Sequence, residues 1–132
     1  MLTPNGSPAA RRILYIDDDA GFGKLATHML ERMGHQVTFF SSPARALDAL
    51  SAQPEGWDIV ITDHRMPGKN GLEVACVVRD RHPRIDYAVV SAYLGAEAVD
   101  AANAAGLGPI LRKPMSSKGF ETLLEQLTCR VG

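Results

Sequence analysis

The sequence lacks any apolar run that approaches the roughly 20 residues a membrane-spanning helix requires. The first dozen residues also lack the apolar core of a secretory signal. We interpret residues 1–11 as a flexible polar tail and residues 12–129 as the folded domain. We therefore expect a cytoplasmic protein with no membrane partner.

An excess of charge of either sign is also absent, because 15 acidic residues oppose 14 Lys and Arg for a net charge of −1. This balance gives no reason to expect nucleic acid as a partner. Cysteine is scarce: Cys76 and Cys129 are far apart and match no metal or redox spacing. We interpret both thiols as packing residues in a reducing compartment.

The 132 residues suffice for one compact domain. Five short apolar runs, each ending at a polar residue, predict buried strands; they are 13–16, 37–40, 58–62, 86–90 and 109–112. Between and after them, apolar residues at helical spacing predict five helices; they are 20–33, 43–53, 71–79, 96–105 and 116–127. Strands that alternate with helices predict an α/β fold, with a doubly wound, five-stranded parallel sheet and helices on both faces.

Polar side chains follow four of these strands. Asp17 and Asp18 end the first strand, Asp63 the third, Ser91 the fourth and Lys113 the fifth. Ligands of doubly wound sheets bind beyond the carboxyl ends of the strands. We therefore expect these five residues to form one site.

Three carboxylates at one edge repel each other unless a positive charge joins them. Mg²⁺ prefers oxygen ligands of this kind, and Lys113 adds a fixed positive charge. Ser91 can donate a hydrogen bond to a phosphoryl oxygen. An aspartate in these surroundings is a competent phosphoryl nucleophile, so Asp63 is the predicted acceptor.

The chain resembles response-regulator receiver domains over roughly residues 12–127. The resemblance rests on five segments in the expected order: Ile16-Asp17-Asp18-Asp19, Asp63-His64-Arg65-Met66-Pro67-Gly68, Asn70-Gly71, Ser91-Ala92 and Lys113-Pro114. It implies a flavodoxin-like fold with strand order 2-1-3-4-5, an order for which a receiver is itself a standing example.

The resemblance implies a two-component phosphorelay. Asp63 would accept a phosphoryl group from a phosphohistidine on a sensor histidine kinase or a histidine phosphotransfer protein. Asp18 would bind Mg²⁺ directly and Asp17 through a water, and Asp63 and the backbone carbonyl of Arg65 would complete the metal site. The protein would catalyse only its own phosphorylation and dephosphorylation, and its downstream effector is not evident from the sequence.

The same resemblance implies the groups that bind the phosphoryl oxygens. They are the Lys113 ammonium, the Ser91 hydroxyl and the backbone amides of His64 and Ala92. Family structures also suggest a cis bond between Lys113 and Pro114, which the weak trans preference of proline permits.

Three positions concern signal output and phosphate lifetime. Many receivers have Tyr or Phe where this chain has Ile110, so we expect a readout that does not use a rotameric aromatic switch, or a relay role. Arg65 and Tyr93 occupy positions that tune dephosphorylation in the family. Both side chains are large, and we expect them to shield the acyl phosphate and slow its hydrolysis.

Two alternatives remain open at the level of sequence. A haloacid-dehalogenase-like phosphatase would use Asp17 as nucleophile and Asp19 as second acid, but it expects Thr or Val where Gly21 stands and leaves Asp63 without a role. A pseudo-receiver scaffold would never be phosphorylated, which the complete acidic, serine and lysine set argues against.

The four histidines show no shared spacing. We interpret His64 as an exposed loop residue, because the phosphohistidine belongs on a partner. His28, His35 and His82 are predicted to lie on the surface.

Overall fold

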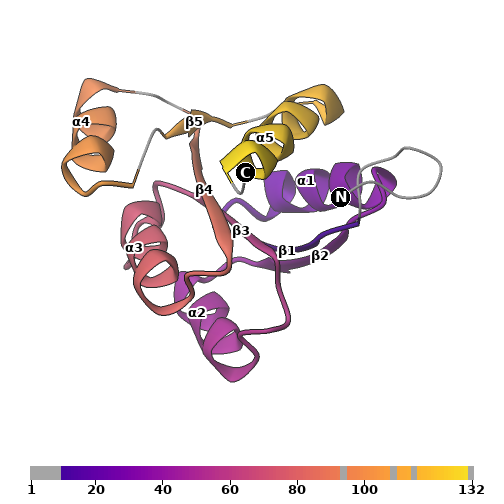
Figure 1. Ribbon diagram of the computed structural model, residues 1–132. Helices are drawn as coiled ribbons and strands as arrows, with labels where there is room; N and C mark the ends of the chain where they lie inside the picture. Colours follow the sequence, from indigo (N-terminus) through magenta and orange to yellow (C-terminus); the bar gives the residue numbers. More distant parts are fainter. Residues whose placement is uncertain (1–9, 93–94, 108–109, 114–115, 131–132) are drawn as a thin grey trace.

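The computed structural model describes residues 10–92, 95–107, 110–113 and 116–130. Strands and helices alternate along the described chain (Figure 1). In order they are β1 (Arg12–Ile16), α1 (Ala20–Arg32), β2 (Gln36–Phe40), α2 (Pro43–Ala52), β3 (Ile59–Asp63), α3 (Gly71–Arg81), β4 (Asp86–Ser91), α4 (Ala96–Ala104), β5 (Leu111–Arg112) and α5 (Ser117–Arg130).

The strands form one parallel sheet in the order β2-β1-β3-β4-β5. Helices α1 and α5 cover one face, and α2, α3 and α4 lie on the other (Figure 1). The predicted doubly wound fold and its strand order are confirmed. Among the described helices, none combines the length and apolar character needed to span a bilayer.

The core consists of two apolar layers separated by the sheet. Successive strand residues point to opposite faces, so Ile13 and Tyr15 pack toward α1 and α5 while Leu14 and Ile16 pack toward α2 and α3. Every residue of β3 is buried. Burial on both faces explains why these strands are continuous apolar runs in the sequence.

The largest boundary difference concerns β5, which is predicted as residues 109–112 but spans only Leu111–Arg112. Residue 109 lies outside the described part of the chain. Ile110 precedes the strand because β5 is an edge strand, paired only with Val90 and Ser91 at the end of β4.

The predicted surface position of His35 is wrong, since only 8% of this residue is exposed. Its Nδ1 atom accepts a hydrogen bond from the backbone amide of Arg11 at 3.0 Å. Burial lowers the pKa of His35, and the positive charge of Arg11 lowers it further. A neutral imidazole therefore anchors the chain just before β1.

A glycine allows α3 to begin directly beside the end of β3. A Cβ atom on Gly71 would lie 2.4 Å from the backbone oxygen of Asp63 and 2.8 Å from the Cα atom of His64. The Gly71 amide also donates to the carbonyl oxygen of His64 at 2.8 Å. Both obstructing atoms belong to the backbone and cannot move aside by a rotamer change.

We predict that Gly71→Ala lowers the free energy of unfolding by about 1–3 kcal/mol, the usual cost of overpacking. Gly21→Ala is the matched control, because the nearest atom to its added Cβ lies at an ordinary 3.4 Å. Alanine is the better helix former by about 1 kcal/mol, so this control should be neutral or stabilising. Urea unfolding of both variants measures the difference, and equal effects would contradict the close approach at Gly71.

Candidate functional site

Three backbone hydrogen bonds hold the polar residues at the carboxyl edge of the sheet. The amide of Asp17 donates to Phe40 O at 3.1 Å, and the amide of Lys113 donates to Ser91 O at 2.8 Å. The amide of His64, the residue after Asp63, donates to the carbonyl oxygen of Val90 at 2.9 Å. The residues that follow β1, β3 and β5 are thereby fixed to neighbouring strands.

The carboxylates of Asp17, Asp18 and Asp63 meet at this edge, each offering an oxygen within 4.8 Å of the other two. Asp17 is fully buried, Asp63 is 7% exposed, and Asp18 faces solvent. Such a set of oxygens, open to water on one side, fits a hard divalent cation that retains some of its waters. The structure therefore brings together the three carboxylates that the sequence assigned to a metal.

The ammonium of Lys113 supplies the positive charge within this cluster. Its Nζ atom lies 2.7 Å from Asp17 Oδ2 and 3.8 Å from Asp63 Oδ1. Within the described residues, Asp17 Oδ2 has no partner besides this ammonium. The longer distance exceeds hydrogen-bond range, so Lys113 is paired with Asp17 and only attracted by Asp63.

The electrostatic surroundings disfavour charge on Asp63. Burial, followed by the negative charge of Asp17, raises the pKa of Asp63 to about 6. Lys113 and a hydrogen bond from the His64 amide oppose this rise but do not cancel it. A bound cation would reverse the balance by favouring the ionised carboxylate.

The other predicted phosphoryl-binding groups have different surroundings. Ser91 is 2% exposed and ends β4, one residue after Val90, which pairs with Asp63. Ala92 follows it and is exposed. The amide of His64 already donates to the sheet, so its predicted phosphoryl contact stays a prediction.

The His64 side chain is only partly exposed, and its Nδ1 atom is buried without a hydrogen-bond partner among the described residues. The expectation of an exposed loop histidine is therefore wrong for His64, whose exposure is intermediate. Burial, followed by the charge of Arg65, lowers the pKa of the His64 imidazole.

The positions assigned to output and lifetime are partly described. Arg65 is exposed in the loop after β3. Ile110 is buried, in the same apolar layer as Ala102 and Leu107. Tyr93 and the predicted cis bond before Pro114 lie outside the described residues.

Sequence reasoning missed an aromatic side chain at this site. The ring of Phe22 lies beneath Lys113, with its centroid 4.2 Å from the ammonium nitrogen. The same ring packs against Tyr15, whose ring contacts Phe120 edge-on. Helical spacing places Phe22 in the first turn of α1. No sequence signal links it to Lys113, which lies far from it along the chain.

Asp19 has a structural role that bears on the phosphatase alternative. Its side chain accepts a hydrogen bond from the amide of Phe22 at 3.1 Å and thereby caps α1. The carboxylate cluster contains Asp18 in place of Asp19. The second acid that a dehalogenase-like phosphatase requires is therefore engaged at a helix end.

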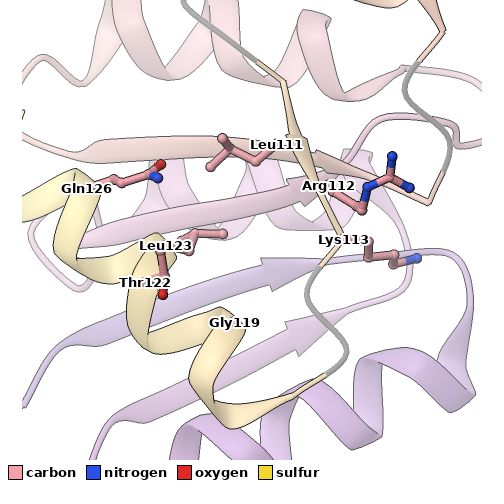
Figure 2. Close-up of a pocket in the computed structure, with 7 residues that line it drawn as sticks. All are labelled: Leu111, Arg112, Lys113, Gly119, Thr122, Leu123 and Gln126. Atoms are coloured by element: carbon pink, nitrogen blue, oxygen red, sulfur yellow. The ribbon is translucent and has the colours of Figure 1, made fainter.

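A groove of about 340 Å³ lies between β5 and α5, on the side of β5 away from the Lys113 ammonium (Figure 2). Its lining residues are Leu111, Arg112, Lys113, Gly119, Thr122, Leu123 and Gln126. In Figure 2 the charged ends of Arg112 and Lys113 point away from the side chains of α5. The groove is therefore separate from the carboxylate cluster, with Lys113 as its only link among the described residues.

The model of the response regulator receiver domain family matches residues 13–125. The sensory/regulatory protein RpfC of Xanthomonas campestris pv. campestris is 32% identical over 119 residues, which cover 86% of this chain and 16% of RpfC. The DNA-binding transcriptional regulator NtrC of Escherichia coli K12 is 28% identical over 111 residues, covering 84% of this chain and 23% of NtrC. The chain thus spans less than a quarter of either relative.

A crystal structure of a response regulator receiver protein from Burkholderia phymatum has a similar fold. Its TM-score to this structure is 0.74 at 32% identity, and the match covers 89% of this chain and 95% of that one. Nearly the whole of that receiver is therefore matched by this chain.

We predict that Asp63→Asn stabilises the metal-free protein at neutral pH. The pKa of Asp63 is raised in the folded state, so its stabilising contribution is present below about pH 4 and is lost as pH rises through about 6. The variant should gain about 1–2 kcal/mol at pH 7.5, allowing for screening by solvent, and the gain should vanish near pH 4. Urea unfolding between pH 4 and 8 without divalent cations measures this dependence.

Asp48→Asn removes a carboxylate from an exposed position on α2 and serves as the control. It should show no such dependence on pH. A difference in the free energy of unfolding between wild type and Asp63→Asn that stays constant across this pH range would contradict the raised pKa of Asp63.

Proposed function

The chain belongs to the response regulator receiver domain family, and from this premise we propose that Asp63 is the residue that accepts the phosphoryl group. The protein is a phosphoaccepting receiver of two-component signalling, not a metabolic enzyme. The observation that carries the proposal for Asp63 is its position: a nearly buried carboxylate in the acidic cluster, with a lysine ammonium 3.8 Å away.

The proposed reaction is an exchange of one bond to phosphorus for another. A carboxylate oxygen of Asp63 attacks the phosphorus of a phosphohistidine on a sensor kinase or phosphotransfer protein. The new P–O bond forms as the P–N bond breaks, and the imidazole leaves with its electron pair and takes a proton from water. The product is an aspartyl phosphate, a covalent species that carboxylate nucleophiles are known to form.

The neighbours of Asp63 have distinct proposed roles. Lys113 would move from Asp17 toward the incoming phosphoryl oxygens, and the Ser91 hydroxyl and the Ala92 amide would donate hydrogen bonds to them. A positive charge held ready for developing negative charge is the main way proteins promote phosphoryl transfer. The protein would in this way promote its own phosphorylation.

A divalent cation, proposed to be Mg²⁺, fits the cluster of Asp17, Asp18 and Asp63, with the backbone carbonyl of Arg65 as a further oxygen. When bound, it would neutralise charge on the transferred phosphoryl group. The chemistry of the three carboxylates supports this assignment, because oxygen ligands are those that Mg²⁺ prefers.

The two other readings have less support. The phosphatase would need Asp19 as an acid, yet its carboxylate caps α1. The pseudo-receiver would give no role to a mutually repelling set of carboxylates, two of which are buried. The phosphatase could use Lys113 beside Asp17 in a supporting part, but it gives no role to Asp63, 3.8 Å from the same ammonium.

We predict that wild-type protein gains one phosphoryl group on incubation with acetyl phosphate and Mg²⁺. Intact-mass spectrometry should show one added phosphoryl group, which hydroxylamine removes because it is an acyl phosphate. Asp63→Asn should show none, and chelation of Mg²⁺ should abolish the reaction in wild type. Lys113→Met should slow it by about 10²-fold or more, since removing one stabilising charge costs this much elsewhere.

Asp48→Asn is the matched control and should be phosphorylated like wild type. An adduct that persists in Asp63→Asn would overturn the assignment of the acceptor. Folded wild type that gains no adduct with Mg²⁺ present would identify a pseudo-receiver, and steady release of phosphate that requires Asp17 would identify a phosphatase.

We also predict that Arg65→Ala shortens the lifetime of the aspartyl phosphate severalfold. The long side chain two residues after the acceptor is expected to cover the acyl phosphate against water. Lys69→Ala, in the same loop and also exposed, is the control and should leave the lifetime unchanged. Loss of ³²P label from purified phosphoprotein measures both rates; identical decay in wild type and Arg65→Ala would refute the shielding role.

A further inference from the structure

The Lys113 ammonium lies over an aromatic ring as well as close to its acidic partners. The ring centroid of Phe22 lies 4.2 Å from the Nζ atom, well within the ~6 Å over which a cation is attracted to a ring face. Only 9% of the lysine side chain is exposed. Little water therefore screens this attraction, which is strongest where the cation is desolvated.

From this contact we infer that Phe22 is a positioning residue: its ring holds the Lys113 ammonium within reach of the phosphoryl group. The inference rests on the proposed function, because it concerns the lysine that would bind the transferred group. It adds a side chain outside the charged and hydroxyl residues of the site.

The fold fixes the position of the Phe22 ring at three points. The amide of Phe22 donates to the side chain of Asp19, which sets the first turn of α1. The ring packs on Tyr15, with the centroids 6.5 Å apart. The next residue, Gly23, has no side chain, and the ring of Phe39 fills the space where its Cβ would lie. Helix α1 therefore packs close to the sheet at the turn that carries Phe22.

The ring matters because the ammonium has competing partners. An ammonium has three N–H donors, and its nearest acidic partner is Asp17, with Oδ2 2.7 Å away. The 3.8 Å separation from Asp63 leaves capacity for one further acceptor at that side. A ring face binds a cation without offering it a lone pair or a formal charge. Phe22 would thus retain the ammonium at the site and still allow it to turn from Asp17 toward a phosphoryl oxygen.

A purely structural role for Phe22 is the alternative, since the ring also packs against the apolar layer beneath α1 and α5. The two roles respond differently to fluorine. Fluorination of the ring withdraws electron density from its face and weakens cation binding, while the shape and apolar character of the ring change little. A packing role depends only on the shape and apolar character of the ring, so it should not respond to fluorine.

The test replaces Phe22 with 4-fluoro-, 3,5-difluoro- and 3,4,5-trifluorophenylalanine and measures the rate of phosphorylation by acetyl phosphate at saturating Mg²⁺. We expect the logarithm of the rate to fall stepwise with each fluorine, with little change in the thermal midpoint. Phe22→Leu should be about fivefold slower than wild type, corresponding to about 1 kcal/mol of cation–π attraction. Phe22→Trp should restore a rate near that of wild type, because indole binds cations best.

The same fluorine series at Phe39 is the matched control, because that ring packs on the same helix at Gly23. It should leave the rate unchanged. A direct readout in unphosphorylated protein is the ¹H shift of the Lys113 ε-methylene group. The ring current of Phe22 should move it upfield in wild type, and Phe22→Leu should abolish this displacement.

The outcomes separate the inference from the function on which it rests. Phosphorylation of wild type on Asp63 with equal rates across the Phe22 series would overturn the positioning role alone. Equal slowing by the Phe22 and Phe39 series would also overturn it, since the effect would then follow packing. Failure of wild type to form the Asp63 adduct would overturn the proposed function, and the positioning role with it.

Discussion

Repulsion among three carboxylates at one edge of a parallel sheet is the constraint on which the site depends. Asp17 and Asp63 are almost fully buried and lie with Asp18 in one cluster. Burial, followed by the negative charge of Asp17, raises the pKa of Asp63, and this rise expresses the free-energy cost of burying like charges together. Lys113 relieves part of it through Asp17. In the unphosphorylated protein, the negative charge at this edge is therefore only partly compensated. A bound cation would complete the compensation and allow a phosphoryl group to be accepted.

The apolar core makes this imbalance possible. Strands buried on both faces cannot shift to separate the carboxylates, because ladder hydrogen bonds continue to Asp17, His64 and Lys113 beyond the strand ends. The start of α3 is pressed against the backbone at Asp63 through Gly71. Packing contacts thus hold in place charges that would move apart in a flexible loop. The same rigidity favours rapid chemistry, because groups that are already oriented need not reorganise.

Aromatic residues link the charged edge of the sheet to the core. Phe22 lies between the Lys113 ammonium and Tyr15, which in turn contacts Phe120 of α5. On the opposite face, Ile110, the predicted switch position, is buried in the core. Within the described part of the chain, the aromatic contacts of this site therefore lie on the side of α1 and α5. Because Lys113 also lines the groove beside α5, a change in its position would alter the lining of that groove.

The sequence by itself determined the alternating elements and the polar residues at the strand ends, because periodicity and strand boundaries are local properties of the chain. From these, the general rule for parallel sheets was enough to predict that Asp17, Asp63 and Lys113 share one edge. Only the tertiary structure decided which carboxylate Lys113 pairs with and that Phe22 lies beneath it. It also decided that His35 is buried. These features depend on distances between segments remote in sequence, and such distances are set by how helices pack on the sheet.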